Sequence, residues 1–246
     1  MDKKFLIFNW KNYLIRKKEA DKLVPLYLKL KKDPRFKVVL APPLSWLGLY
    51  PEFERASQDV SLSSFKDLVG EVPAINLKSL GVKYAIIGHS SRRIKLKESD
   101  EQINQKIKIA LASGLYPVFC LGENRVQRKK GLTAAVLKNQ LKKGLKGIKP
   151  LLLSKIIFVY EPVWAIYPQA PDTPRDALEM VLYLLKTISQ MYGFHQPQIL
   201  YGGSVNGKNI NDFLAFKEIK GALIGYAGTK EQELEKIIEA LRYGKH

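Results

Sequence analysis

The sequence predicts an α/β fold, a single closed (β/α)8 barrel that takes in residues 1–246 as one domain. Eight short apolar runs alternate with amphipathic helical segments along the whole chain, at about one pair per 30 residues. The length of 246 residues matches the roughly 250 that such a barrel needs. No Gly-x-Gly-x-x-Gly motif follows the first strand, which argues against an open dinucleotide-binding sheet. No Gly/Ser-rich linker marks a domain boundary.

The strands are predicted from apolar runs that are mostly continuous rather than alternating, as expected for strands buried on both faces. In chain order they are Lys4–Phe8, Lys37–Leu40, Val60–Leu62, Tyr84–Ile87, Tyr116–Leu121, Ile156–Tyr160, Gln198–Tyr201 and Ala222–Ile224.

The helices between the strands carry start and stop signals. Ser99–Gln102 is a capping-box sequence, and Thr173 is a cap followed by proline in the first turn. Gly193 is predicted to end the helix that begins near Thr173, and Thr229 to cap the last helix. Pro25 is expected to kink the first helix. The predicted buried faces are Ile103, Ile107, Ala110 and Leu111; Ala177, Val181, Leu184 and Ile188; and Leu234, Ile237, Ile238 and Leu241.

The composition indicates the cellular compartment and the classes of partner to expect. With 41 basic and 23 acidic residues the net charge is +18, but the lysines are scattered over helical segments rather than clustered with aromatic residues. Solvated helix faces are therefore expected, and no nucleic-acid partner. No apolar run approaches the roughly 20 residues that span a bilayer, so no membrane association is expected. The single cysteine, Cys120, is typical of a reducing compartment, and we expect a cytoplasmic protein.

Polar residues and glycine turns follow five of the predicted strands. The carboxyl ends of all strands meet at one mouth in such a barrel, so these groups are expected to lie together. Burial raises the pKa of a carboxylate, which would make Glu161 a usable base, although a solvated strand-end glutamate is the alternative. The joint pattern predicts proton transfer beside a carbonyl of a small phosphorylated substrate. The groups are Asn9 and Lys11, His89, Glu161, and the turns Gly202–Ser204 and Gly225–Gly228, each turn expected to precede a helix.

Five motifs that span nearly the whole chain resemble triosephosphate isomerases, in that family's order and spacing. They are Asn9-Trp10-Lys11, Ile86-Ile87-Gly88-His89-Ser90 with Arg92-Arg93, Cys120-Leu121-Gly122-Glu123, Tyr160-Glu161-Pro162-Val163-Trp164-Ala165-Ile166 and Tyr201-Gly202-Gly203-Ser204-Val205. The resemblance implies a TIM barrel that interconverts dihydroxyacetone phosphate and D-glyceraldehyde 3-phosphate, a step of glycolysis and gluconeogenesis. It implies no metal and no organic cofactor.

The same resemblance assigns roles to individual residues. Glu161 is the base, a neutral His89 polarises the carbonyl, and Lys11 with Asn9 beside it supplies positive charge for the substrate and the enediolate. The loop from Pro162 to about Asp172 is a lid that excludes water. The phosphate would be held by backbone N–H groups near Tyr167, Ser204, Gly225 and Tyr226.

Four departures from the family pattern surround the site. Ser91 replaces a glutamate that contacts the site lysine, and Tyr226 replaces a glycine in the last turn. The lid tip is Tyr167-Pro168-Gln169-Ala170, followed by Pro171, so a stiffer lid is expected. The family is a homodimer in which a threonine reaches the partner's site; here that position is Val69, which leaves the oligomeric state open.

These departures leave three alternatives to a fully active isomerase. The first is the same reaction at a reduced rate, because altered supports cost rate without changing the chemistry. The second is an idle barrel that binds sugar phosphates. The third is an isomerase of a larger phosphorylated sugar.

Overall fold

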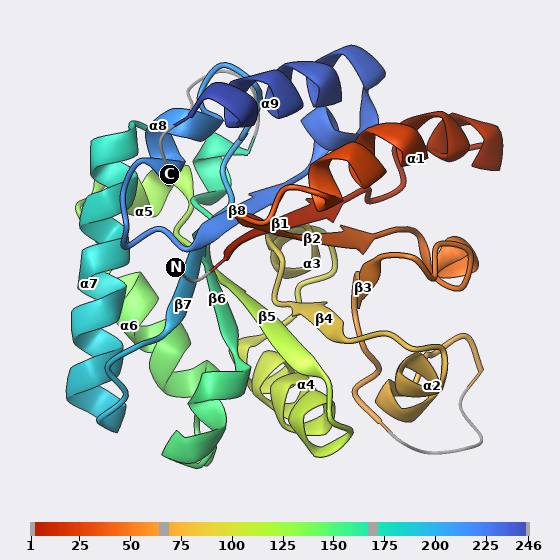
Figure 1. The fold of residues 1–246 in the computed structure, drawn as a ribbon. Coiled ribbons are helices and arrows are strands. Elements are labelled where there is room, and N and C mark those ends of the chain that lie inside the picture. Colours follow the sequence, from red (N-terminus) through yellow and green to blue (C-terminus); the bar gives the residue numbers. More distant parts are fainter. Residues whose placement is uncertain (1–2, 64–68, 167–171, 245–246) are drawn as a thin grey trace.

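The computed structural model of the protein describes residues 3–63, 69–166 and 172–244. Its centre is a closed barrel of eight parallel strands in sequence order, in which β1 pairs with both β2 and β8 (Figure 1). The predicted (β/α)8 architecture is confirmed. The strands are β1 (Lys4–Asn9), β2 (Phe36–Ala41), β3 (Glu54–Ser57), β4 (Tyr84–Ile87), β5 (Tyr116–Leu121), β6 (Ile157–Tyr160), β7 (Gln198–Tyr201) and β8 (Gly221–Ile224).

Helices surround the barrel and connect each strand to the next (Figure 1). Four short 3-10 helices also lie within the described residues: η1 (Leu44–Trp46), η2 (Pro150–Lys155), η3 (Val163–Ala165) and η4 (Tyr226–Thr229). The α-helices are α1 (Lys17–Lys31), α2 (Ala74–Ser79), α3 (Ser90–Lys95), α4 (Asp100–Ala112), α5 (Arg125–Lys129), α6 (Thr133–Gly144), α7 (Pro174–Tyr192), α8 (Ile210–Leu214) and α9 (Glu231–Tyr243).

Each strand buries both of its faces, which explains why the strand sequences are continuously apolar. One cluster fills the barrel interior and includes Ile7, Val39, Ile86 and Leu200. A second, larger cluster lies between the strands and the helices, and it contains the apolar faces predicted for α4, α7 and α9. None of the helices in the described ranges is long and apolar enough to cross a membrane.

The third strand lies at β3, so the prediction of Val60–Leu62 was wrong. Val60 is buried, but it belongs to the loop after the strand. The strand was missed because its sequence, Glu-Arg-Ala-Ser, is polar. Neighbouring strands make that polarity tolerable: Glu54 accepts hydrogen bonds from Lys83 Nζ (2.7 Å) and Tyr84 OH (2.8 Å). Buried Arg55 donates to the Leu47 carbonyl (2.8 Å).

Most predicted helix ends are confirmed. Ser99 forms a capping box with Gln102, Thr173 caps α7, and Gly193 ends α7 in a left-handed conformation (φ 65°). Thr229 is not the cap of α9: its hydroxyl donates to the Tyr226 carbonyl (2.8 Å), and no side chain caps that helix. The helix α1 runs across Pro25.

Tyr27 joins α1 to the two strands that close the barrel. Its hydroxyl accepts a hydrogen bond from Trp10 Nε1 (3.1 Å) just after β1 and donates one to the Gly228 carbonyl (2.5 Å) just after β8. Its ring packs edge-on against Phe8, with centroids 4.8 Å apart. One fully buried hydroxyl therefore holds the helix and both closing segments together.

Replacing Tyr27 by phenylalanine should lower the free energy of unfolding by about 2 kcal/mol, because a buried N–H and a buried carbonyl both lose their partner. Chemical denaturation measures this loss. Tyr243→Phe, on an exposed ring of α9, is the matched control and should stay within about 0.5 kcal/mol of wild type. Equal losses in the two variants would show that the hydroxyl bridge is not stabilising.

Candidate active site

Side chains from β1, β4 and β6 meet at the carboxyl ends of the strands. Asn9 is the last residue of β1, and Lys11, His89 and Glu161 follow β1, β4 and β6 within two residues of each strand. A closed parallel barrel brings these ends to one mouth. A cavity of about 80 Å³ lies there, and its lining residues are Lys11, His89, Ser90, Ser91, Ile94, Lys95, Val163 and Ile166.

The backbone at Lys11 is held in a left-handed conformation (φ 48°), which is unusual for a residue with a side chain. Three hydrogen bonds hold this turn in place. Asn9 Oδ1 accepts from the Lys11 N–H (3.1 Å), and Gln58 Nε2 donates to the carbonyls of Lys11 and Ala41 (both 3.0 Å). Asn9 and Gln58 therefore set the position of the lysine, and their contacts offset the backbone strain.

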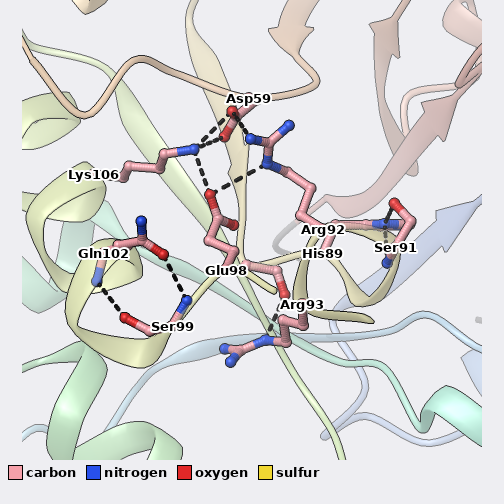
Figure 2. Close-up of polar contacts among 10 residues, drawn as sticks. Asp59, His89, Ser91, Arg92, Arg93, Glu98, Ser99, Gln102 and Lys106 are labelled. Atoms are coloured by element: carbon pink, nitrogen blue, oxygen red, sulfur yellow. Dashed lines mark hydrogen bonds and ion pairs between the residues drawn. The ribbon is translucent and has the colours of Figure 1, made fainter. Parts of the chain in front are cut away.

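His89 is the amino-terminal cap of α3, and this fixes its tautomer. Its Nδ1 accepts a hydrogen bond from the Ser91 N–H (3.2 Å) and lies 2.8 Å from Ser91 Oγ, as Figure 2 shows. A nitrogen that accepts an N–H bond carries no proton, so the ring proton lies on Nε2. The imidazole is neutral and directs an N–H group towards Glu161.

Glu161 is buried, with 3% of its surface exposed, and its carboxylate is bound on both oxygens. Oε1 lies 2.9 Å from His89 Nε2 and 3.2 Å from Ser90 Oγ, while Oε2 accepts from the Ser90 N–H (2.9 Å). Burial raises the pKa of Glu161, but contacts with His89 and Ser90 and the charge of Lys11 together bring that pKa below its ordinary value. The raised pKa expected from the sequence is wrong here, and the carboxylate is ionised at neutral pH.

The chain around Glu161 packs closely against the end of β5. The Glu161 N–H donates to the Leu121 carbonyl (2.7 Å). A Cβ atom on Gly122 would lie 1.9 Å from the Glu161 carbonyl oxygen, so only glycine allows the two segments to approach this closely.

The loop after Glu161 is fastened to its neighbours as far as the structure describes it. Trp164 Nε1 donates to Glu123 Oε1 (2.8 Å), and Ser204 Oγ donates to the Ala165 carbonyl (2.5 Å). The predicted lid tip, Tyr167-Pro168-Gln169-Ala170 with Pro171, lies outside the described residues. The phosphate contact expected at Tyr167 and the stiffness expected of the lid therefore stay predictions.

The turns after β7 and β8 present free hydrogen-bond donors. Within the described part of the chain, the N–H groups of Ser204, Gly225 and Tyr226 donate to no acceptor. Gly225 faces Lys11: a Cβ atom built on it would lie 3.8 Å from Lys11 Nζ. Gly225 leads directly into η4, and the next helix after the turn that follows β7 is α8, which begins at Ile210.

Among the described residues, Glu98 forms its ion pairs with cations other than Lys11. It binds Lys106 and Arg92 (Oε1 to Nε 3.3 Å), and Asp59 bridges the same two cations at 2.7 Å each, as Figure 2 shows. This network joins the loop after β3 to α3 and α4.

Three residues that contribute to the site were not assigned a role from the sequence. Ser90 binds Glu161 through two groups, and Glu123 binds Trp164 at the base of the loop; both lie inside recognisable motifs, which is the signal that could have found them. Gln58 follows the polar strand β3, and no local pattern marks it.

Asp172, where the described chain resumes after the lid, is a buried acid. It is 3% exposed, neither carboxylate oxygen has a hydrogen-bond partner among the described residues, and Arg128 Nη2 is 3.8 Å from Oδ1. Burial raises the pKa of Asp172 to about 7, Arg128 opposes that rise, and Asp176 and Glu123 add to it. The group therefore titrates near neutral pH.

Asp172 should make the folded state less stable as pH rises. Its folded pKa lies above the unfolded value of 3.8, so the stabilisation is complete below about pH 4 and lost as pH rises through about 7. Asp172→Asn should match wild type at pH 4 and exceed its free energy of unfolding by about 2 kcal/mol at pH 8. Denaturation at both pH values measures this, with exposed Asp212→Asn as control. A pH-independent difference would contradict the assignment.

Comparisons with known proteins agree with this geometry. The family model described as triosephosphate isomerase matches residues 4–241. The triosephosphate isomerase of Mycoplasmoides gallisepticum is 38% identical, over 97% of this chain and 98% of that protein. Those of Caldanaerobacter subterraneus subsp. tengcongensis and Dictyoglomus thermophilum are each 36% identical, over 94% and 98% of this chain and 96% and 100% of theirs. The chain belongs to the triosephosphate isomerase family.

Proposed function

We infer that the protein is an isomerase that interconverts dihydroxyacetone phosphate and D-glyceraldehyde 3-phosphate. The observation that carries the inference is the contact between the Glu161 carboxylate and the neutral His89 Nε2–H beside a cavity lined by Lys11, in a chain of this family. A base, a hydrogen-bond donor and a cation around one small cavity suit proton transfer next to a carbonyl.

Glu161 is the base that moves a proton between the two adjacent carbons, and His89 polarises the carbonyl. The single ring proton of His89 can serve one acceptor at a time, and in this structure it lies towards Glu161. Substrate binding must therefore separate the two: the carboxylate turns to the carbon, and Nε2–H turns to the substrate oxygen. The lowered pKa of Glu161 keeps the base ionised before substrate arrives.

Lys11 and the free backbone N–H groups bind different negatively charged parts of the substrate. The ammonium of Lys11, held in place by Asn9, stabilises the enediolate oxygen as negative charge develops on it. The N–H groups of Ser204, Gly225 and Tyr226 hold the phosphate, with that of Tyr167 completing the set when the lid closes and excludes water.

Glu161→Gln tests the assignment most directly. It preserves shape but removes the base, so kcat should fall by about 10³-fold while the melting temperature stays close to that of wild type. A coupled assay of triose phosphate interconversion measures this, with exposed Glu179→Gln on α7 as control. A wild-type chain that binds phosphate without turnover would favour an idle sugar-phosphate-binding barrel, and faster turnover of a longer sugar phosphate would favour the larger substrate.

We also infer that two copies of the chain form a dimer through the loops after β1–β4. Many of the exposed large apolar side chains among the described residues lie on the segments between β1 and α4, and a large exposed apolar surface is typical of an interaction site. Val69, 94% exposed, suits burial by a partner. The set is Ile15, Leu44, Leu49, Val69, Ile75, Leu80, Ile94 and Leu96.

Sedimentation of wild type should give the mass of a dimer, and Ile15→Asp should shift it towards the monomer because a charge would be buried in the interface. Leu151→Asp, equally exposed but on η2 before β6, is the matched control and should remain dimeric. A monomeric wild type would overturn the inference.

The cytoplasm is the compartment we propose. The lone thiol, Cys120, is buried and unpaired, which suits a reducing environment. The substrate is a small phosphorylated molecule, and the surplus of 18 positive charges would attract it in a salt-dependent way. We propose no nucleic-acid or membrane partner.

A further inference from the structure

The ammonium of Lys11 is supported by an aromatic ring rather than by an acid. Among the described residues, no carboxylate oxygen lies within 4.0 Å of it, and its Nζ is 5.7 Å from the centroid of the Tyr13 ring. That distance places the cation within the range in which a ring face attracts a positive charge.

Tyr13 is itself supported by Tyr226. The two rings meet edge to face, with centroids 5.4 Å apart and planes inclined by 83°. Lys230 Nζ in turn lies 5.2 Å from the centroid of the Tyr226 ring. The four side chains form a row of contacts that begins and ends with a cation: Lys11, Tyr13, Tyr226 and Lys230.

The row crosses the seam where the barrel closes. Lys11 and Tyr13 follow β1, Tyr226 is the first residue of η4 after β8, and β1 pairs with β8. Gly225, beside Tyr226, also faces Lys11. A tyrosine side chain has only two rotatable bonds before its hydroxyl, so an edge-to-face pair fixes a neighbouring cation at little entropic cost.

We propose that Tyr13 and Tyr226 are positioning residues for Lys11, holding its ammonium at the cavity in the place of an acidic partner. This rests on the proposed function, because it assigns to the pair an effect on the step that Lys11 serves. Neither tyrosine is required to touch the reacting atoms.

The proposal differs from a role in phosphate binding alone. Tyr226 carries one of the free N–H groups, and its side chain could act only by shaping that turn. In that case Tyr13, which is on another loop, would have no effect on the reaction. A shared role through Lys11 instead requires both rings and neither hydroxyl.

The test measures kcat and KM of triose phosphate interconversion for Tyr13→Leu, Tyr226→Leu, the double variant and Tyr13→Phe. We expect each leucine variant to lower kcat about fivefold, the double variant to lose little more than either alone, and Tyr13→Phe, which keeps the ring, to retain wild-type kcat. Tyr243→Leu, which removes an exposed ring beside Arg242, is the matched control and should be unaffected.

Other outcomes overturn the proposal. A higher KM in Tyr226→Leu, with no change of kcat or KM in Tyr13→Leu, would assign Tyr226 to the phosphate alone. If the fold-losses in kcat of the two single variants multiply in the double variant, the two rings do not act as a unit. A Tyr13→Phe variant as impaired as Tyr13→Leu would assign the effect to the hydroxyl rather than to the ring. A wild-type chain without isomerase activity would remove the proposed function itself, whereas an active wild type with unaffected leucine variants would remove only this inference.

Discussion

The pairing of β1 with β8 closes the ladder of parallel strands, and the geometry of the site depends on that closure. Residues Phe5–Phe8 lie opposite Gly221–Ile224, so the start and the end of the chain form adjacent walls of one barrel. Tyr27 spans the outside of this seam through Trp10 and Gly228. Without closure, Lys11 would not have Gly225 beside it, and Tyr13 would not have Tyr226 beside it.

At the mouth of the barrel, the contact between His89 and Glu161 depends on which nitrogen of His89 carries the ring proton. The Ser91 N–H, in the first turn of α3, donates a hydrogen bond to Nδ1 of His89. The ring proton therefore lies on Nε2, and the imidazole is neutral. A buried carboxylate is costly unless it is bound, and here the contacts with His89 and Ser90 and the charge of Lys11 together lower the pKa of Glu161 by more than burial raises it. In the proposed mechanism, the contact that helps to keep Glu161 charged is exchanged for contacts to the substrate, so the two groups assigned to the reaction already lie together in this structure.

The departures from the family pattern belong to the site and have local physical consequences. Ser91 stands where the resemblance implies a glutamate, and it contacts the histidine that the proposed mechanism makes catalytic. Glu98 is committed to Arg92 and Lys106. Tyr226 introduces a ring that packs against Tyr13, over which the Lys11 ammonium lies. The Lys11 ammonium therefore lies beside an aromatic ring, and no carboxylate oxygen among the described residues is within 4.0 Å of it.

The sequence by itself determined seven of the eight strands, the main helix caps and the set of groups at the strand ends, because apolar runs, caps and strand-end residues are local patterns. It failed at β3, whose polar side chains are satisfied by Lys83, Tyr84 and Leu47 from other segments. The sequence predicted a raised pKa for Glu161, which is the wrong direction. An apolar strand reveals the burial of Glu161, but the donors Ser90 and His89 follow another strand and cannot be paired with it from the sequence. Only the tertiary structure decided the partners of Lys11 and the isolation of Asp172, since each depends on atoms that are distant in the chain and adjacent only after the barrel closes.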